Sequence, residues 1–164
     1  MPPPSFTTAD LFDAAGERCY SCSVQFRQFG GRRAFAGRIR TIRCHADNAL
    51  VRRALESRSP GEVLVVDGGG FLGAALLGDQ LAALGIKNGW GGVVIHGVIR
   101  DSVVIAQMDF AVKALGTNPR KSEKRGLGEP DVAVEFGGVT FTPGHWLYSD
   151  DDGILVAADS LVAL

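Results

Sequence analysis

The two most apolar stretches of this chain constrain its fold more than any other feature. Residues 62–70, EVLVVDGGG, and residues 91–101, GGVVIHGVIRD, each contain an almost unbroken series of apolar side chains. A strand this apolar is buried on both faces, which is typical of a parallel sheet covered on both sides. Residues 75–89, ALLGDQLAALGIKNG, lie between them and follow a helical pattern. We therefore expect a crossover unit of strand, helix and strand.

Further elements extend this unit in both directions along the chain. Residues 7–16 predict a short helix that Thr7 or Thr8 can cap and Gly16 can end. Alternation of apolar and basic residues over 35–44 indicates a half-buried strand. Three more elements are predicted: a helix at 47–57 with Asp47 at its start, a short helix at 102–107 and a strand at 110–117.

The C-terminal part of the chain has a different character. Residues 118–131, NPRKSEKRGLGEPD, are polar and basic, which predicts a long exposed loop. Its cations are expected to be solvated, and the alternative is that they contact an acidic partner or RNA: Arg120, Lys121, Lys124 and Arg125. Residues 132–157 consist of short β-rich runs separated by Gly-Gly, Pro-Gly and Asp-Gly, which predict antiparallel hairpins. We predict a single domain over residues 1–164, of α/β fold class, in which a β-rich C-terminal half packs on a crossover half in three layers.

The composition argues against several function classes. The 164 residues carry a formal net charge of −1, so no overall basic field would attract nucleic acid. No apolar run approaches the roughly 20 residues that cross a bilayer, and the first residues lack the pattern of a signal peptide. The expected location is the cytoplasm. Cys19 and Cys22 form one C-x-x-C and Cys44 stands apart, which favours reduced thiols over a zinc site.

Residues at the ends of the predicted elements are the candidates for chemistry. Arg100 and Asp101 end the second apolar strand, and Gly78 precedes the expected crossover helix. Ligands of open α/β sheets bind beyond the carboxyl ends of the strands, and the free N–H groups of a helix start favour anions. Arg100 could hold a carboxylate, and Asp101 could hold Mg²⁺ or Mn²⁺. The alternative is structural: Asp101 caps the next helix, and Arg100 lies on the surface.

Other polar motifs are less specific. Gly68, Gly70 and Gly73 match the spacing of a dinucleotide-binding turn, but no acidic residue ends a strand about 20 residues later. The three histidines have no metal-ligand spacing, which favours structural roles for them.

Longer motifs occur in order along almost the whole chain: QFRQFGGRRAFAGRIRTIRCHADNALVRRAL, GEVLVVDGGG, ALLGDQLA, NGWGGVVIHGVIRD, DFAVKALGTNPRKSEKRGLGE and FGGVTFTPGHWLYSDDDGILV. They resemble the RraA-like family, which includes the regulator of ribonuclease E activity and the class II 4-hydroxy-4-methyl-2-oxoglutarate/oxaloacetate aldolases. The resemblance implies a swivelling β/β/α domain that assembles as a homotrimer, sometimes doubled to a hexamer. It also implies a divalent-metal site in a cleft between subunits.

The resemblance assigns roles to particular residues. The substrate-binding residues of the family's aldolases correspond here to Gly78, Asp79, Gln80, Leu81 and Arg100. Their metal ligand corresponds to Asp101, which forms the catalytic pair with Arg100. The implied reactions release pyruvate from 4-hydroxy-4-methyl-2-oxoglutarate and from oxaloacetate, two short 2-oxo acids, with Mg²⁺ or Mn²⁺ as the Lewis acid.

One position departs from the aldolase pattern. The aldolases continue Arg-Asp-x-x-Glu/Asp, whereas this chain has Val104 where the acid should stand. The ribonuclease regulators also depart from the pattern here, so the alternative function is that of a non-enzymatic inhibitor that binds a ribonuclease E-type endonuclease. Some relatives carry the label demethylmenaquinone methyltransferase, but the sequence has no convincing S-adenosylmethionine site.

Overall fold

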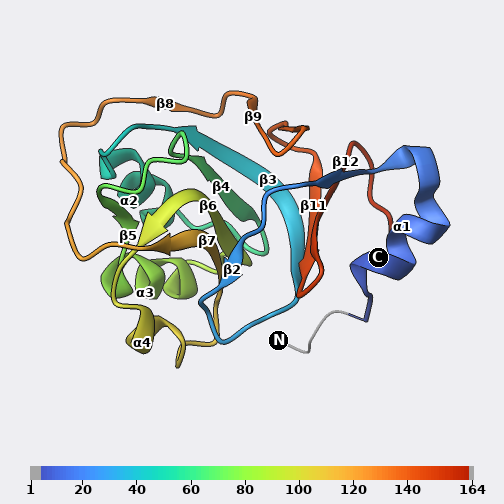
Figure 1. Cartoon of the computed structure of the whole chain (residues 1–164), viewed down its shortest axis with the longest axis horizontal. Coiled ribbons are helices and arrows are strands. Elements are labelled where there is room, and N and C mark those ends of the chain that lie inside the picture. The colour runs from blue at the N-terminus through green and yellow to red at the C-terminus, as the bar shows by residue number, and fades with distance from the viewer. Residues whose placement is uncertain (1–4, 163–164) are drawn as a thin grey trace.

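The computed structural model describes residues 5–162, and one mixed β-sheet runs through the molecule (Figure 1). The centre of the sheet is parallel, and its strands pair in the order β3 (Phe35–Arg43), β4 (Val63–Asp67), β6 (Gly92–Ile99) and β7 (Ala111–Thr117). The first four residues of β4 and of β6 are buried without alternation. This confirms that their apolar sequences reflect burial on both faces.

The other half of the sheet is antiparallel. β3 also pairs with β11 (Trp146–Asp150), β11 pairs with β12 (Gly153–Ala157), and β12 pairs with β1 (Tyr20–Cys22). Short strands complete it: β2 (Arg27–Gln28) pairs with β7, β5 (Ala75–Leu77) with β6 and β8 (Glu129–Pro130) with β3, while β9 (Val134–Phe136) and β10 (Val139–Phe141) form a separate hairpin. The predicted C-terminal hairpins are thereby confirmed.

Hydrophobic clusters lie on both faces of the parallel strands and create the three layers. On one face, Leu55 and Leu81 belong to the cluster that covers Ile95; the helices of this layer are α2 (Ala49–Glu56), α3 (Asp79–Lys87) and α4 (Ser102–Ile105). On the opposite face, Val94 packs with Phe141 and other residues of the hairpins. The predicted α/β fold class, with a β-rich half packed on a crossover half, is confirmed.

The helix predicted over 75–89 is shorter than expected. Residues Ala75–Leu77 are buried and form β5, and α3 begins only at Asp79. A short apolar run fits either a strand or a helix, and in this case the pairing with β6 selects the strand. The other predicted helices form where expected, and Gly16 ends the first of them, α1 (Thr8–Ala15). None of the helices among residues 5–162 is long and apolar enough to cross a membrane.

The three cysteines are free thiols with separate environments. Cys19 belongs to the cluster beneath α1, whereas Cys22 packs against the cluster between the sheet and the hairpins. Residues three apart in an extended segment point to opposite faces, which explains why the C-x-x-C does not form a joint site. Burial raises the pKa of the Cys44 thiol to about 12, and the nearby carboxylates of Asp47 and Asp67 add to the effect.

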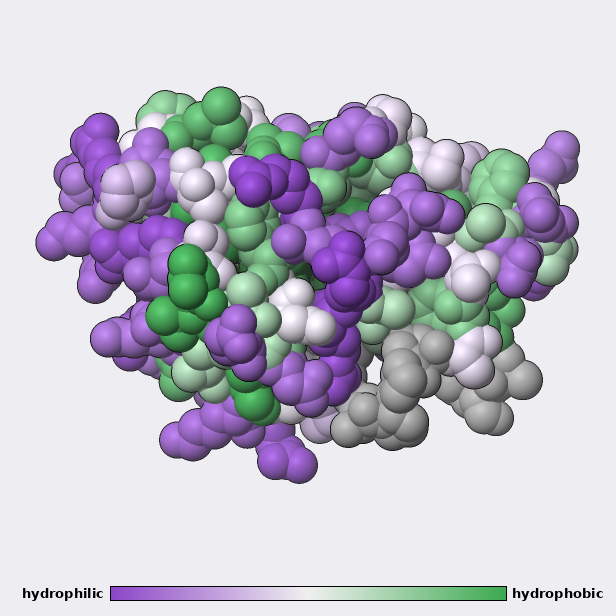
Figure 2. Space-filling view, turned by 60° about the horizontal axis from the view of Figure 1, so that its bottom comes forward, coloured by the Kyte–Doolittle hydropathy of each residue, from purple (hydrophilic) through white to green (hydrophobic). Residues whose placement is uncertain are grey.

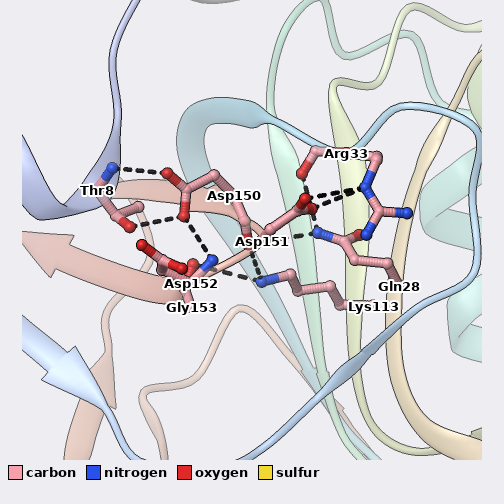
Figure 3. A network of polar contacts seen from close by, with 8 residues as sticks. All are labelled: Thr8, Gln28, Arg33, Lys113, Asp150, Asp151, Asp152 and Gly153. Atoms are coloured by element: carbon pink, nitrogen blue, oxygen red, sulfur yellow. Dashed lines mark hydrogen bonds and ion pairs between the residues drawn. The ribbon is translucent and has the colours of Figure 1, made fainter.

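A network of polar contacts ties α1 to the turn between β11 and β12 (Figure 3). The carboxylate of Asp150 accepts hydrogen bonds from the backbone N–H of Thr8 at 2.7 Å and from its hydroxyl at 2.6 Å. From β7, the Nζ of Lys113 donates to the backbone oxygens of Asp150 at 2.6 Å and Gly153 at 3.3 Å. Burial lowers the pKa of Lys113 to about 8, although the carboxylates of Asp150 and Asp151 raise it.

The lowered pKa of Lys113 predicts a pH dependence of stability. The unfolded chain holds the lysine proton up to about pH 10.4, so unfolding takes up a proton between pH 8 and that value, and stability rises with pH there. We expect the unfolding free energy of the wild type to rise by about 1–2 kcal/mol more than that of Lys113→Met between pH 8 and 10. Urea titrations of both proteins would measure this difference, and parallel pH profiles would contradict the assignment.

Candidate functional site

A hollow of about 210 Å³ opens beside the carboxyl end of β6, and every residue of the predicted site lines it. We call it the β5–α3 hollow and define it by its lining: residues 48, 49, 52, 75, 77–81, 100, 101, 121, 122 and 124. Gly78, Asp79, Gln80 and Leu81 come from the start of α3, and Arg100 and Asp101 follow β6 directly. The fold therefore brings together two segments about 20 residues apart, because β5 and β6 pair side by side.

The backbone of Asp101 adopts the left-handed conformation, with φ 59° and ψ 37°. This conformation is unfavourable for residues other than glycine, although aspartate and asparagine tolerate it better than most. Asp101 precedes α4 as its N-cap residue, but its side chain makes no capping hydrogen bond there. Its Oδ2 instead accepts the backbone N–H of Asp79 at 3.1 Å. The carboxylate therefore binds at the start of α3, where the positive end of the helix dipole stabilises it.

Gly78 is needed because other side chains approach it closely. A Cβ at this position would lie 2.7 Å from Oδ2 of Asp101 and 3.5 Å from Cγ and Nε of Arg100. Gly78 is also the N-cap of α3 and offers no side chain to the N–H groups of the first turn. Of the N–H groups in this first turn, only that of Asp79 has a side-chain acceptor among the described residues. The N–H groups of Gln80 and Leu81 are therefore free to bind an anion.

Cations dominate the charge of the hollow. Its lining holds Arg52, Arg100, Lys121 and Lys124, against the carboxylates of Asp79 and Asp101, which leaves an excess of two positive charges. Arg52 pairs with Glu56 outside the hollow at 2.9 Å. Within residues 5–162, the other three cations have no ion pair. The hollow therefore favours an anionic ligand.

The loop at 118–131 is exposed or half-exposed as predicted, except at Ser122. The side chain of Ser122 is buried, and its hydroxyl donates to the backbone oxygen of Ala75 at 2.7 Å. The N–H of Ala75 in turn donates to the oxygen of Arg120 at 2.8 Å. These contacts hold the loop against β5 and place Lys121 and Lys124 at the hollow. No signal in the sequence separates these two lysines from the neighbouring arginines, because the distinction depends on which way the anchored loop turns.

Asp47 fixes the next part of the same loop. Its carboxylate is only 2% exposed and accepts hydrogen bonds from the N–H groups of Ala49, Arg125, Gly126 and Leu127. Burial favours the neutral acid, but these four hydrogen bonds outweigh it and hold the pKa of Asp47 below its ordinary value. Asp47 was predicted only to start a helix; in the structure it also joins that helix to the basic loop.

The remaining polar motifs lie apart from the hollow. His96 faces Asp67 at 3.4 Å, and its ring stacks on Phe136 with 4.5 Å between centroids. His45 packs on Phe71. Val104 is on α4, is 48% exposed and does not line the hollow. Histidines 45 and 96 therefore make ring contacts outside the hollow.

The donor chemistry of the hollow is compatible with a hard divalent cation. Residues 5–162 contain no cluster of three or more histidine, cysteine, aspartate or glutamate side chains that could enclose a metal. Mg²⁺ does not require such a cluster, because it usually keeps several waters and binds through one or two carboxylates together with oxygens of the substrate. Asp101 and Asp79 offer carboxylates of this kind.

Comparison with known proteins places the chain among proteins of the same architecture. The model of the RraA-like family, described as Aldolase/RraA, matches residues 8–156. The chain belongs to the RraA-like family. An RraA-like relative from Aromatoleum aromaticum, provisionally named a 4-hydroxy-4-methyl-2-oxoglutarate aldolase, is 56% identical over 157 residues, which cover 96% of this chain and 99% of the relative. The family resemblance of the sequence is confirmed.

Solved structures agree with this RraA-like fold. One from Geobacillus kaustophilus, described as an S-adenosylmethionine:2-dimethylmenaquinone methyltransferase, is 49% identical with a TM-score of 0.94 and covers 95% of this chain and 97% of its own. The RNA-processing inhibitor RraA from Thermus thermophilis is 44% identical with a TM-score of 0.92 and covers 95% of this chain and 94% of its own. Relatives of one fold thus carry three different functional descriptions.

Proposed function

We propose that this RraA-like protein is a divalent-metal-dependent aldolase that releases pyruvate from 4-hydroxy-4-methyl-2-oxoglutarate and also decarboxylates oxaloacetate. The observation that carries the proposal is the meeting of Arg100, Asp101 and the free N–H groups at the start of α3 in one hollow. These groups suit a carboxylate next to a hydrated cation. The name of the Aromatoleum relative supports the same reaction class.

The substrate would bind through its 2-oxo acid end. The guanidinium of Arg100 can hold the first carboxylate with two hydrogen bonds, and the N–H groups of Gln80 and Leu81 can donate to the same end of the molecule. Asp101 would hold Mg²⁺ or Mn²⁺, and the bound ion would supply Lewis acidity toward the keto oxygen. The hydrogen bond that the Asp101 carboxylate accepts from the N–H of Asp79 holds this side chain at the start of α3, beside the N–H groups that would bind the substrate.

Both reactions break a bond to the carbon next to the keto group. In 4-hydroxy-4-methyl-2-oxoglutarate, the C3–C4 bond breaks, its electron pair forms the enolate of pyruvate, and the C4 hydroxyl loses its proton as a second pyruvate leaves. In oxaloacetate the leaving molecule is carbon dioxide, and the enolate is the same. Protonation at C3 completes either reaction. The positive charge of Arg100 would stabilise the negative charge that develops on the enolate.

We also propose that the RraA-like chain acts as a homotrimer or a doubled trimer. Phe71 is 37% exposed and Leu72 is 58% exposed in the loop before β5. The backbone oxygen of Leu72 accepts a hydrogen bond from the side chain of Asn118, which lines a shallow hollow together with Arg100 and Asp101. Exposed apolar side chains that gather near a site are typical of contact surfaces. Figure 2 shows how hydrophobic residues form separate patches among hydrophilic ones on one face.

A second candidate function is inhibition of a ribonuclease E-type endonuclease. It is favoured by Val104 in place of the aldolase acid and by the 44% identity with the RNA-processing inhibitor RraA. In contrast, the cationic lining of the hollow does not favour the methyltransferase description of the Geobacillus structure, because the sulfonium of S-adenosylmethionine would be repelled there.

An assay of pyruvate release distinguishes the two candidates. The purified protein is mixed with oxaloacetate or 4-hydroxy-4-methyl-2-oxoglutarate, with Mg²⁺, with Mn²⁺ or with a chelator. We expect metal-dependent pyruvate formation above the rate of metal and substrate alone. If that excess is missing and the protein retains a ribonuclease E-type endonuclease in a pull-down that suppresses RNA cleavage, the inhibitor function replaces the aldolase.

A further inference from the structure

The β5–α3 hollow contains more positive charge than one carboxylate requires. Arg100 suffices for the carboxylate next to the keto group. Lys121 and Lys124 line the same hollow and, within residues 5–162, have no acidic partner within ion-pair distance. Two cations in a single hollow repel each other, and an anion bound between them offsets this repulsion. The unassigned charge therefore points to a second acidic group on the ligand.

The position of the two lysines is set by the fold of the loop. Ser122 lies between them in sequence and is bonded to Ala75 of β5, and the N–H of Asn48 at the start of α2 donates to the oxygen of Glu123 at 3.0 Å. Asp47 then fixes the backbone directly after Lys124. These anchors lie on both sides of the lysines, so their Cα positions are constrained although their side chains are exposed.

Neighbouring cations in the same loop provide a natural comparison. Arg120 and Arg125 directly flank the segment, are exposed like the lysines and carry the same charge, but neither lines the hollow. A general electrostatic attraction would depend on all four cations, whereas a direct contact would depend on the two lysines alone.

We propose that Lys121 and Lys124 bind the second carboxylate of the substrate, the one carried by the leaving half of 4-hydroxy-4-methyl-2-oxoglutarate, and thereby select dicarboxylates over monocarboxylates. This inference rests on the proposed function. The first carboxylate is then held at the Arg100 end and the second at the lysine end, and the bond that breaks lies between these two points. Holding both ends restricts the rotation of the substrate and favours a reactive orientation.

Binding of non-cleavable ligands tests the inference without any turnover. 2-Oxoglutarate and 2-oxopentanoate have the same chain length and differ in that a carboxylate replaces a methyl group. Calorimetry with Mg²⁺ should show that the wild type binds 2-oxoglutarate about 10- to 100-fold more tightly. The Lys121→Gln/Lys124→Gln variant should lose this preference and bind 2-oxopentanoate unchanged. The Arg120→Gln/Arg125→Gln variant, with the same loss of charge, should keep it.

Turnover provides the second readout. Cleavage of 4-hydroxy-4-methyl-2-oxoglutarate should fall in the lysine variant, whereas cleavage of 4-hydroxy-2-oxopentanoate, whose leaving half is uncharged acetaldehyde, should not. Equal losses on both substrates, or equal effects of the lysine and arginine variants, would overturn the inference. A wild type that prefers 2-oxoglutarate through its lysines but cleaves nothing would refute the proposed aldolase and leave the carboxylate assignment standing.

Discussion

Replacing Asp101 with asparagine should lower metal-dependent pyruvate release by about 100-fold or more while leaving the fold intact. The neutral amide is a much weaker ligand for a hard cation than the carboxylate, so the affinity for Mg²⁺ or Mn²⁺ falls. The amide oxygen can still accept the N–H of Asp79, which the carboxylate binds at 3.1 Å in the wild type. The experiment therefore separates the charge of this side chain from its structural contact.

Asparagine is the appropriate replacement because of the backbone at this position. The φ of 59° is unfavourable for alanine, whereas asparagine tolerates it about as well as aspartate. We expect the melting temperature of Asp101→Asn to stay within a few degrees of the wild type. The measurement is the rate of pyruvate formation over a titration of Mg²⁺ or Mn²⁺, with circular dichroism as the control. Activity close to that of the wild type would remove Asp101 from the metal site.

Val104→Glu should raise the rate of aldol cleavage about tenfold or more, because it restores the acid that the aldolase pattern has three residues after Asp101. Asp101 is the N-cap of α4 and Val104 lies in the first turn of that helix, so the longer side chain of a glutamate at position 104 could reach the waters around a cation held by Asp101. A positioned carboxylate there can accept or return the proton that the reaction moves. Val104 is 48% exposed, so the charge can be accommodated.

Val103→Glu is the matched control. Val103 is adjacent in the same helix and 80% exposed, but it stands two residues after Asp101, at a different angle around the helix axis. It receives the same charge without the predicted geometry, and its activity should stay at the wild-type rate. Equal rates for both variants and the wild type would show that an acid at position 104 does not contribute to the reaction. Val104 would then not be the reason for a low rate of cleavage.

Much of the fold could be predicted from local patterns. The uninterrupted apolar runs that became β4 and β6 predicted a parallel sheet, and the Gly-Gly and Asp-Gly turns predicted the hairpins β9–β10 and β11–β12. Each of these signals lies within about ten residues, so it needs no knowledge of distant contacts. The strand β5 was missed because three apolar residues before a helix carry too little periodicity to distinguish strand from helix.

The sequence by itself determined which residues could carry the chemistry: the Arg100–Asp101 pair at a strand end and the glycine-led start of a helix. Only the tertiary structure decided that Asp101 binds at the start of α3 rather than at its own helix, and that Lys121 and Lys124 turn toward the hollow. The physical reason is that these outcomes depend on groups far apart along the chain, such as Asp47 with residues 125–127. Backbone pairing brings such groups together, and no local pattern records it.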